Sequence, residues 1–73
     1  MDRIDLLKTF VVVVNEGSFT NAASKLDMSN QLVSKYINQL EKRLDARLFN
    51  RTTRKIHLTE AGYQCLQHAN HIL

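Results

Sequence analysis

The chain has 73 residues, enough for one domain with one small hydrophobic core. Hydrophobic residues make up 44% and charged residues 23%, a balance typical of folded domains and not of disordered ones. The longest aliphatic run, Val11 to Val14, is far too short to cross a bilayer, and the first residues lack the features of a secretion signal. The single cysteine, Cys65, cannot form an internal disulfide. We therefore expect a cytoplasmic protein without a membrane segment.

Positive charge is concentrated in the middle of the chain. Residues 31–58 contain seven Lys or Arg and two Asp or Glu, a net charge of +5, whereas the segments before and after them each carry a net charge of −1. A basic segment of this kind is expected where a protein meets a polyanion. A solvated charged face is the commoner origin of such a pattern, so the charge alone does not decide the function.

A first helix is predicted from about residue 3 to residue 16. Its apolar residues recur at helical spacing and share one face: Ile4, Leu7, Phe10, Val11 and Val14. Asp2 is well placed to cap its start. Gly17 is well placed to end it, because glycine adopts a left-handed backbone without strain.

Two further helices follow at very short intervals. Ser18 is a candidate cap for a helix over residues 19–26, in which Ala22 and Ala23 are small enough to let another helix approach closely. Residues 27 and 28 form a very short connection, and Ser29 is the candidate cap of the third helix. Helices joined so tightly cross at a steep angle, which is the geometry of a helix-turn-helix.

The third helix has two distinct faces. An apolar stripe is predicted from Val33, Ile37, Leu40 and Leu44. The opposite direction is polar and basic, with Gln31, Lys35, Asn38 and Lys42 at its centre and Asn30 and Ser34 on its flank. An amphipathic surface helix with no further role would show the same pattern.

The periodicity changes after the third helix. Residues 46–51 and 56–58 are predicted to form two short strands around a polar, basic turn at residues 52–55. Thr59 is the candidate cap of a fourth helix, which runs toward Leu73 and stops within apolar sequence, as expected for a piece of a longer protein. The predicted fold is mainly α: a three-helix core, a two-stranded β wing and a long carboxy-terminal helix, which together make a winged helix-turn-helix.

The chain resembles the amino-terminal domain of LysR-type transcriptional regulators over nearly its whole length. The segments that carry the resemblance are Leu7–Phe10, Glu16–Phe19, Ala22-Ala23, Leu26, Ser29, Val33-Ser34, Ile37, Leu40-Glu41, Leu44, Leu48-Phe49, Arg51 and Leu58–Gly62. The chain departs from the family pattern at Asp45, where glycine is common, at Lys35, where arginine is frequent, and at Asn30-Gln31 and Tyr36.

The resemblance implies a domain over residues 1–59, with the helix-turn-helix at about 19–38 and the wing at about 46–58. Residues 60–73 would begin a linker helix that pairs two subunits. It also implies a dimer, with higher oligomers possible in the full-length protein, that binds operator double-stranded DNA and has no enzymatic activity. A small-molecule effector would act only through a carboxy-terminal domain outside this sequence. A helical protein-interaction module, with the third helix as its docking face, is the alternative.

The resemblance assigns three groups of contact residues. Because residues near the amino end of a recognition helix usually reach base edges, the base-reading candidates are Asn30, Gln31, Ser34 and Lys35. The candidates for contacts to the DNA backbone are Ser18, Thr20, Asn38, Lys42, Arg51, Thr52, Thr53, Arg54 and Lys55, of which Arg54 would alternatively enter the minor groove. The candidates for dimerisation are Tyr63, Leu66, Ala69, Asn70 and Leu73, although packing on the first helix competes for the same side of the fourth.

No cofactor, metal or catalytic site is predicted. Cys65, His68 and His71 are spaced at i, i+3 and i+6, which spreads them over about 120° of a helix, too wide for one ion without another chain. The sequence offers no glycine-rich phosphate loop and no nucleophile with an obvious base.

Overall fold

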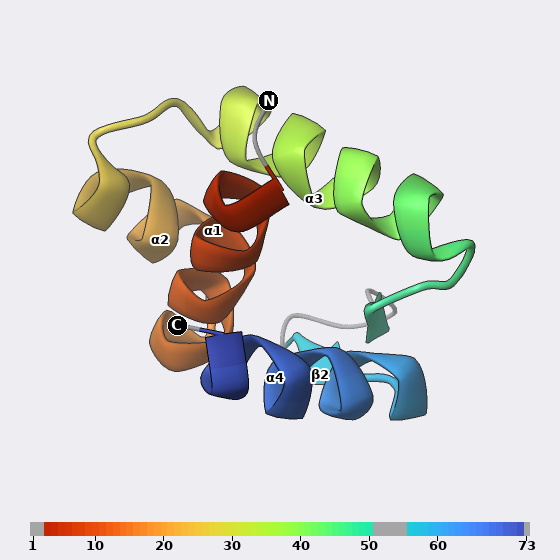
Figure 1. The fold of residues 1–73 in the computed structure, drawn as a ribbon. Coiled ribbons are helices and arrows are strands. Elements are labelled where there is room, and N and C mark those ends of the chain that lie inside the picture. Colours follow the sequence, from red (N-terminus) through yellow and green to blue (C-terminus); the bar gives the residue numbers. More distant parts are fainter. Residues whose placement is uncertain (1–2, 51–55, 73) are drawn as a thin grey trace.

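The computed structural model describes residues 3–50 and 56–72. Within these ranges the chain forms α1 (Arg3–Glu16), α2 (Phe19–Leu26), α3 (Asn30–Leu44), β1 (Phe49–Asn50), β2 (His57–Leu58) and α4 (Glu60–Ile72). Figure 1 shows α1 in the middle of the molecule, with α3 above it, α4 below it and α2 at its side. The predicted winged helix-turn-helix architecture is confirmed.

Most helix ends are set by residues next to them in the sequence. Gly17 ends α1 in the left-handed conformation, with φ +68°. The hydroxyl of Ser18 accepts a hydrogen bond from Asn21 N at 3.2 Å, and the hydroxyl of Ser29 accepts one from Leu32 N at 3.0 Å. These bonds satisfy first-turn N–H groups that have no partner within their helix. The predicted roles of these three residues are confirmed, whereas the predicted cap Asp2 lies outside the described residues.

The hydrophobic core is centred on α1 and draws residues from every helix. Its buried members are Leu6, Leu7, Phe10, Val13, Ala22, Ala23, Val33, Ile37, Leu40, Leu48, Phe49, Cys65 and Ala69. The ring of Phe49 lies 5.4 Å from that of Phe10 and 5.8 Å from that of Phe19, measured between centroids. These ring contacts join β1 to both α1 and α2, so the base of the wing is part of the same core.

The predicted apolar face of α1 was partly wrong. Leu6 and Val13 are fully buried although they were not assigned to it, whereas Ile4 is 42% exposed and Val14 is only half-buried. The reason is that α1 contacts α2, α3 and α4, so it buries more of its circumference than one stripe. Thr9 is buried as well, and its hydroxyl donates to Asp5 O at 2.9 Å, which satisfies its polar group.

The apolar stripe of α3 is shorter than predicted. Val33, Ile37 and Leu40 are buried, but Leu44 is 45% exposed. Leu44 lies in the last turn of α3 and borders an open groove between α1, α3 and α4, which is also lined by Leu7. One side of Leu44 therefore faces solvent.

The strands of the wing are also shorter than predicted. Each has two residues, paired antiparallel with Phe49 opposite Leu58 and Asn50 opposite His57. The residues before β1 do not extend the strand because their backbone groups bond elsewhere: Ala46 N donates to Glu41 O at 3.2 Å, and Leu48 N donates to Glu41 Oε2 at 2.8 Å. The predicted basic tip, residues 51–55, lies outside the described residues.

The start of α4 is fixed onto the segment that leads into β1. The hydroxyl of Thr59 accepts from Gly62 N at 3.0 Å, the predicted cap, and donates to Arg47 O. The N–H of Thr59 donates to Leu48 O at 3.0 Å. Gly62 packs so closely that an added Cβ would lie 2.3 Å from Leu48 O. Only glycine fits at this position of α4.

Candidate nucleic-acid interface

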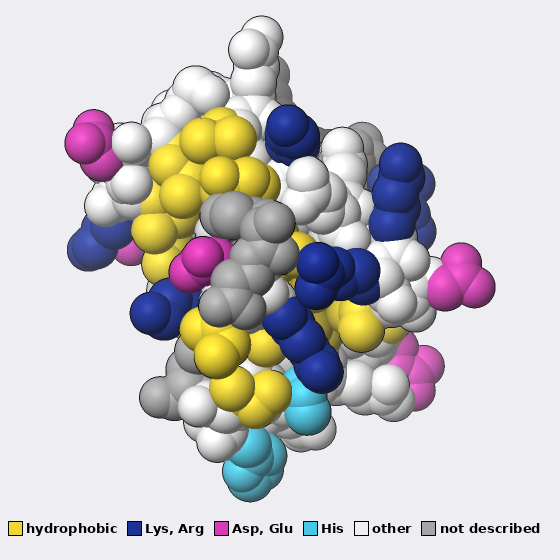
Figure 2. Space-filling view, turned by 45° about the horizontal axis from the view of Figure 1, so that its top comes forward, with side chains coloured by type: hydrophobic (Ala, Val, Ile, Leu, Met, Phe, Trp, Pro, Cys, Tyr) yellow, Lys and Arg dark blue, Asp and Glu magenta, His cyan; other side chains and the backbone are white. Residues whose placement is uncertain are grey.

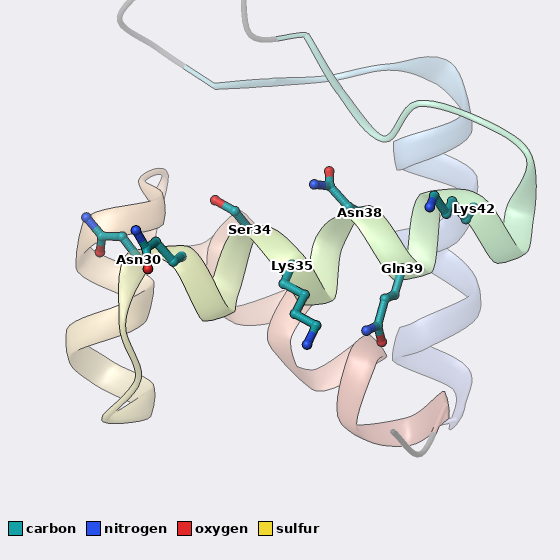
Figure 3. Close-up of a pocket in the computed structure, with 7 residues that line it drawn as sticks. Asn30, Ser34, Lys35, Asn38, Gln39 and Lys42 are labelled. Atoms are coloured by element: carbon teal, nitrogen blue, oxygen red, sulfur yellow. The ribbon is translucent and has the colours of Figure 1, made fainter.

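The polar face of α3 forms an open groove on the surface (Figure 3). The described residues that line it are Asn30, Gln31, Ser34, Lys35, Asn38, Gln39 and Lys42. All four predicted base-reading residues are among them, together with two of the residues predicted to contact the DNA backbone. Figure 3 shows Ser34 and Asn38 pointing to one side of α3, and Lys35 and Gln39 pointing to the other.

The opposite face of α3 holds the helix in the domain. Val33 and Ile37 are fully buried there. On the groove side, Gln31, Lys35 and Asn38 are exposed. A helix anchored on one side in this way presents its polar side chains outward on a rigid support, and Gln31, Lys35 and Asn38 stay exposed among the described residues. Of the described residues that line the groove, two are lysines and none is acidic.

The sequence analysis did not assign Gln39 to this face. Gln39 is half-buried and lines the groove beside Lys35. The signal was present in the sequence, because residues four apart on a helix lie on the same side, and Gln39 follows Lys35 by four residues.

The start of α3 touches α2. Asn30 Nδ2 donates a hydrogen bond to Thr20 Oγ1, with 3.3 Å between the two atoms. Both residues are exposed. This hydrogen bond therefore joins Asn30, a predicted base-reading residue, to Thr20, which is predicted to contact the DNA backbone. Ser18 is less accessible, because it is half-buried and its hydroxyl already accepts from Asn21 N.

Basic side chains are exposed around the end of α3 and the start of the wing. Lys35, Lys42, Arg43 and Arg47 are all exposed. On the face drawn in Figure 2, Lys and Arg side chains lie at the centre and right and also at the left edge, below a patch of hydrophobic side chains at the upper left. The five wing residues predicted to contact the DNA backbone lie outside the described residues: Arg51, Thr52, Thr53, Arg54 and Lys55.

On α4, the predicted dimerisation residues have different environments. Tyr63 is 61% exposed and Asn70 is exposed, while Leu66 is half-buried. Ala69, in contrast, is fully buried within this chain. Ala69 belongs to the hydrophobic core of this chain, and α4 packs on α1, which is the competing use predicted for this side of the helix. Leu73 lies outside the described residues.

Cys65 and the nearby histidine do not form a metal centre with the described residues around them. Among these residues, no group of three or more His, Cys, Asp or Glu side chains is arranged to hold a metal ion. Burial raises the pKa of the Cys65 thiol, although the nearby Arg3 acts in the opposite direction. Arg3 also lies with Nη2 3.3 Å from His68 Nε2. In residues 3–50 and 56–72, no helix is long and apolar enough to cross a membrane.

Comparison with known proteins gives consistent matches across the chain. Residues 4–63 match the family model for bacterial regulatory helix-turn-helix proteins of the lysR family. The HTH-type transcriptional regulator CrgA of Neisseria meningitidis is 48% identical over 67 residues, which cover 92% of this chain and 22% of that protein. The HTH-type transcriptional activator AaeR of Escherichia coli is 47% identical over 62 residues, which cover 85% of this chain and 20% of that protein.

A solved structure is similar in fold as well as in sequence. The crystal structure of a BenM DBD/catB site 1 DNA complex matches with a TM-score of 0.91 and 35% identity, covering 97% of this chain and 79% of that one. The present chain spans about a fifth of the length of the curated relatives that it matches.

Proposed function

Because this chain belongs to the lysR family of bacterial regulatory helix-turn-helix proteins, we propose that it is the sequence-specific DNA-binding domain of a transcriptional regulator. The observation that carries the proposal is the outward polar face of α3, held in place by the buried Val33, Ile37 and Leu40. The major groove of DNA admits one α-helix and displays a distinct pattern of donors and acceptors for each base pair. A helix that is anchored on one face and polar on the other suits that groove.

Base reading is assigned to the amino-terminal half of α3. The amides of Asn30 and Gln31 are suited to bidentate bonds with adenine, and the ammonium group of Lys35 is suited to the O6 and N7 acceptors of guanine. Ser34 would bond to either kind of base. To these predicted residues we add Gln39, which lies in the second half of α3 but lines the same groove as Lys35.

Contacts to phosphate groups are assigned to the flanks of this face. The proposed residues are Ser18, Thr20, Asn38, Lys42 and the wing residues Arg51, Thr52, Thr53, Arg54 and Lys55. Such contacts fix the position of a protein on the duplex but carry little sequence information. They would give most of the salt dependence of binding.

Assembly and regulation are proposed from the family. Two copies would pair through α4, with Tyr63, Leu66, Asn70 and Leu73 at the contact, and would bind an inverted repeat with recognition helices roughly 34 Å apart. In the longer protein, higher oligomers would form and a carboxy-terminal domain would bind a small-molecule effector. We propose that the domain binds DNA and catalyses no reaction. The protein would act on the chromosome, in the bacterial cytoplasm.

The proposal is tested by selecting bound duplexes from a random pool and then measuring affinity against salt concentration. We expect one preferred sequence and a log–log salt slope of about −0.9 for each phosphate contacted. Lys35→Ala should lower the ratio of affinities for selected and random duplex. Lys8→Ala is the matched control, because it removes the same charge from an exposed residue of α1 outside the groove.

The alternative function gives a different result. If no duplex is selected and the chain binds a protein partner with little dependence on salt, α3 is a docking face and the DNA-binding proposal fails.

A further inference from the structure

We propose that Thr20 is a positioning residue for base reading: it fixes the orientation of the Asn30 amide and couples a phosphate contact on α2 to a base contact on α3. The inference rests on the proposed function and deepens it. It begins from the bond between Asn30 Nδ2 and Thr20 Oγ1, which joins residues ten apart in the sequence across the turn between the two helices.

The backbone around this bond is well fixed. Thr20 lies in the first turn of α2, whose start is capped by Ser18, and Asn30 is the first residue of α3, whose start is capped by Ser29. In the connection, Asp27 N donates to Ser24 O at 3.3 Å and Met28 N donates to Ala23 O at 2.9 Å. Thr20 and Asn30 therefore both lie in helix starts whose backbone is held by capping and turn hydrogen bonds.

The chemistry of the bond selects one orientation of the amide. A primary amide has two N–H donors on nitrogen and an acceptor on oxygen. With one N–H given to Thr20, Asn30 retains one N–H and its oxygen, the combination that reads adenine at N7 and N6. In the flipped orientation, Asn30 Oδ1 would face Thr20, and the hydroxyl would have to donate its single proton to it.

A phosphate contact would exclude that flipped orientation. A hydroxyl has one proton, and when Thr20 donates it to a phosphate oxygen, only its lone pairs remain for Asn30. The Asn30 amide must then present its nitrogen to Thr20 and its oxygen elsewhere. Binding of the DNA backbone by Thr20 thus holds the reading residue in the state suited to adenine.

The test compares Thr20→Val with Thr20→Ser after the preferred duplex has been selected. Valine keeps the shape of threonine but has no hydroxyl, whereas serine keeps the hydroxyl. Affinity is measured on duplexes that carry each of the four bases at each position in turn. We expect Thr20→Val to lower the preference for adenine by roughly tenfold at one position, the same position that Asn30→Ala affects. Thr20→Ser should retain the preference.

Two further measurements make the test specific. The double variant Thr20→Val/Asn30→Ala should lose no more preference than Asn30→Ala alone, because both changes remove one interaction. Ser24→Ala, which removes an exposed hydroxyl from the same helix, should leave the preference intact.

A contrary result has a distinct form. If Thr20→Val weakens binding to all duplexes equally and the preference at every position persists, Thr20 contacts phosphate only and the inference is wrong. Failure of the unmodified chain to select any duplex would instead remove the proposed function, on which the inference depends.

Discussion

The helix-turn-helix, α2 and α3, and the second half of the chain, from the wing to α4, are held together by different kinds of contact. In the first region, Ser18 and Ser29 cap helices that begin one residue later. The second is held by contacts between more distant residues: Leu48 N donates to Glu41 of α3, seven residues earlier, and Thr59 donates to Arg47 O, twelve residues earlier. Capping residues next to the helices thus set the start of α3, the proposed reading helix. Hydrogen bonds between residues distant in the sequence fix the segment that leads into the wing.

The largest expected effect is at Gly62, in the second region. In Gly62→Ala, the new Cβ would overlap the backbone oxygen of Leu48 and the side chain of Leu58, at 2.3 and 2.8 Å. A backbone oxygen cannot move aside without shifting the segment before β1. We expect the free energy of unfolding to fall by about 3 kcal/mol, measured by urea denaturation.

Gly17→Ala is the matched control for this change. Gly17 has a left-handed φ of +68° but no heavy atom within 4 Å of the added Cβ, so only the backbone conformation is penalised, by about 1 kcal/mol. If the two variants lose equal stability, the close contact between Gly62 of α4 and the backbone of Leu48 contributes no additional stability to the second region.

The next effect is at Glu41, which joins the two regions. Glu41→Ala removes the carboxylate that accepts from Leu48 N and leaves the N–H of a buried residue without this partner. We expect a loss of about 2 kcal/mol and faster hydrogen exchange at the Leu48 amide. Glu41→Gln keeps an acceptor oxygen and should lose less. Unchanged exchange at Leu48 in Glu41→Ala would show that this bond does not hold the wing to α3.

The difference between local capping signals and hydrogen bonds to distant residues explains which parts of the fold could be predicted. The predicted bounds of α1 and α2 match the structure because Gly17 and Ser18 mark their ends locally. The first strand was predicted too long because residues 46–48 have strand-like side chains, while their backbone groups bond to Glu41 and Thr59. A pattern within residues 46–51 contains no information about partners outside that segment.

Burial was predicted well only where a helix packs on one side. In α3 the alternation of faces correctly separated Val33 and Ile37 from the polar groove. It failed for α1, which contacts three helices. It left Ala69 undecided, since the sequence does not show whether a small residue meets its own domain or a second subunit. Gln39 was missed although its spacing from Lys35 placed it on the groove side.

A smaller effect is expected at the start of the reading helix. Ser29→Ala removes the oxygen that accepts from Leu32 N and should lower the free energy of unfolding by about 1 kcal/mol. Ser29→Asp keeps a capping oxygen and should lose little. Because Asn30 and Gln31 lie in the turn that Ser29 caps, Ser29→Ala should also weaken DNA binding more than Ser24→Ala does, since Ser24 is an exposed residue of α2 with no assigned contact to DNA. Equal binding by the two variants would mean that the cap of α3 is not needed to order the reading residues.

The smallest effect has the opposite sign. Asp45 ends α3 in the left-handed conformation, with φ 51° and ψ 43°, where glycine would be free of strain. Its negative charge also lies at the carboxy-terminal end of a helix, which is unfavourable. We expect Asp45→Gly to raise the free energy of unfolding by about 0.5 kcal/mol, since glycine relieves the strain but also increases the entropy of the unfolded chain.

Asp45→Asn separates the two causes, because asparagine removes the charge and still tolerates a left-handed backbone. If strain dominates, the gain from Asp45→Gly exceeds that from Asp45→Asn and persists at high salt. If charge dominates, the two variants gain equally and the gain falls as salt screens the helix end. Asp27, which ends α2 with φ 57°, allows the same pair of substitutions on the other side of the reading helix. A strain-dominated gain at both aspartates would show that the fold imposes the left-handed backbone at these two helix ends. The charge of aspartate would then have little effect on stability there.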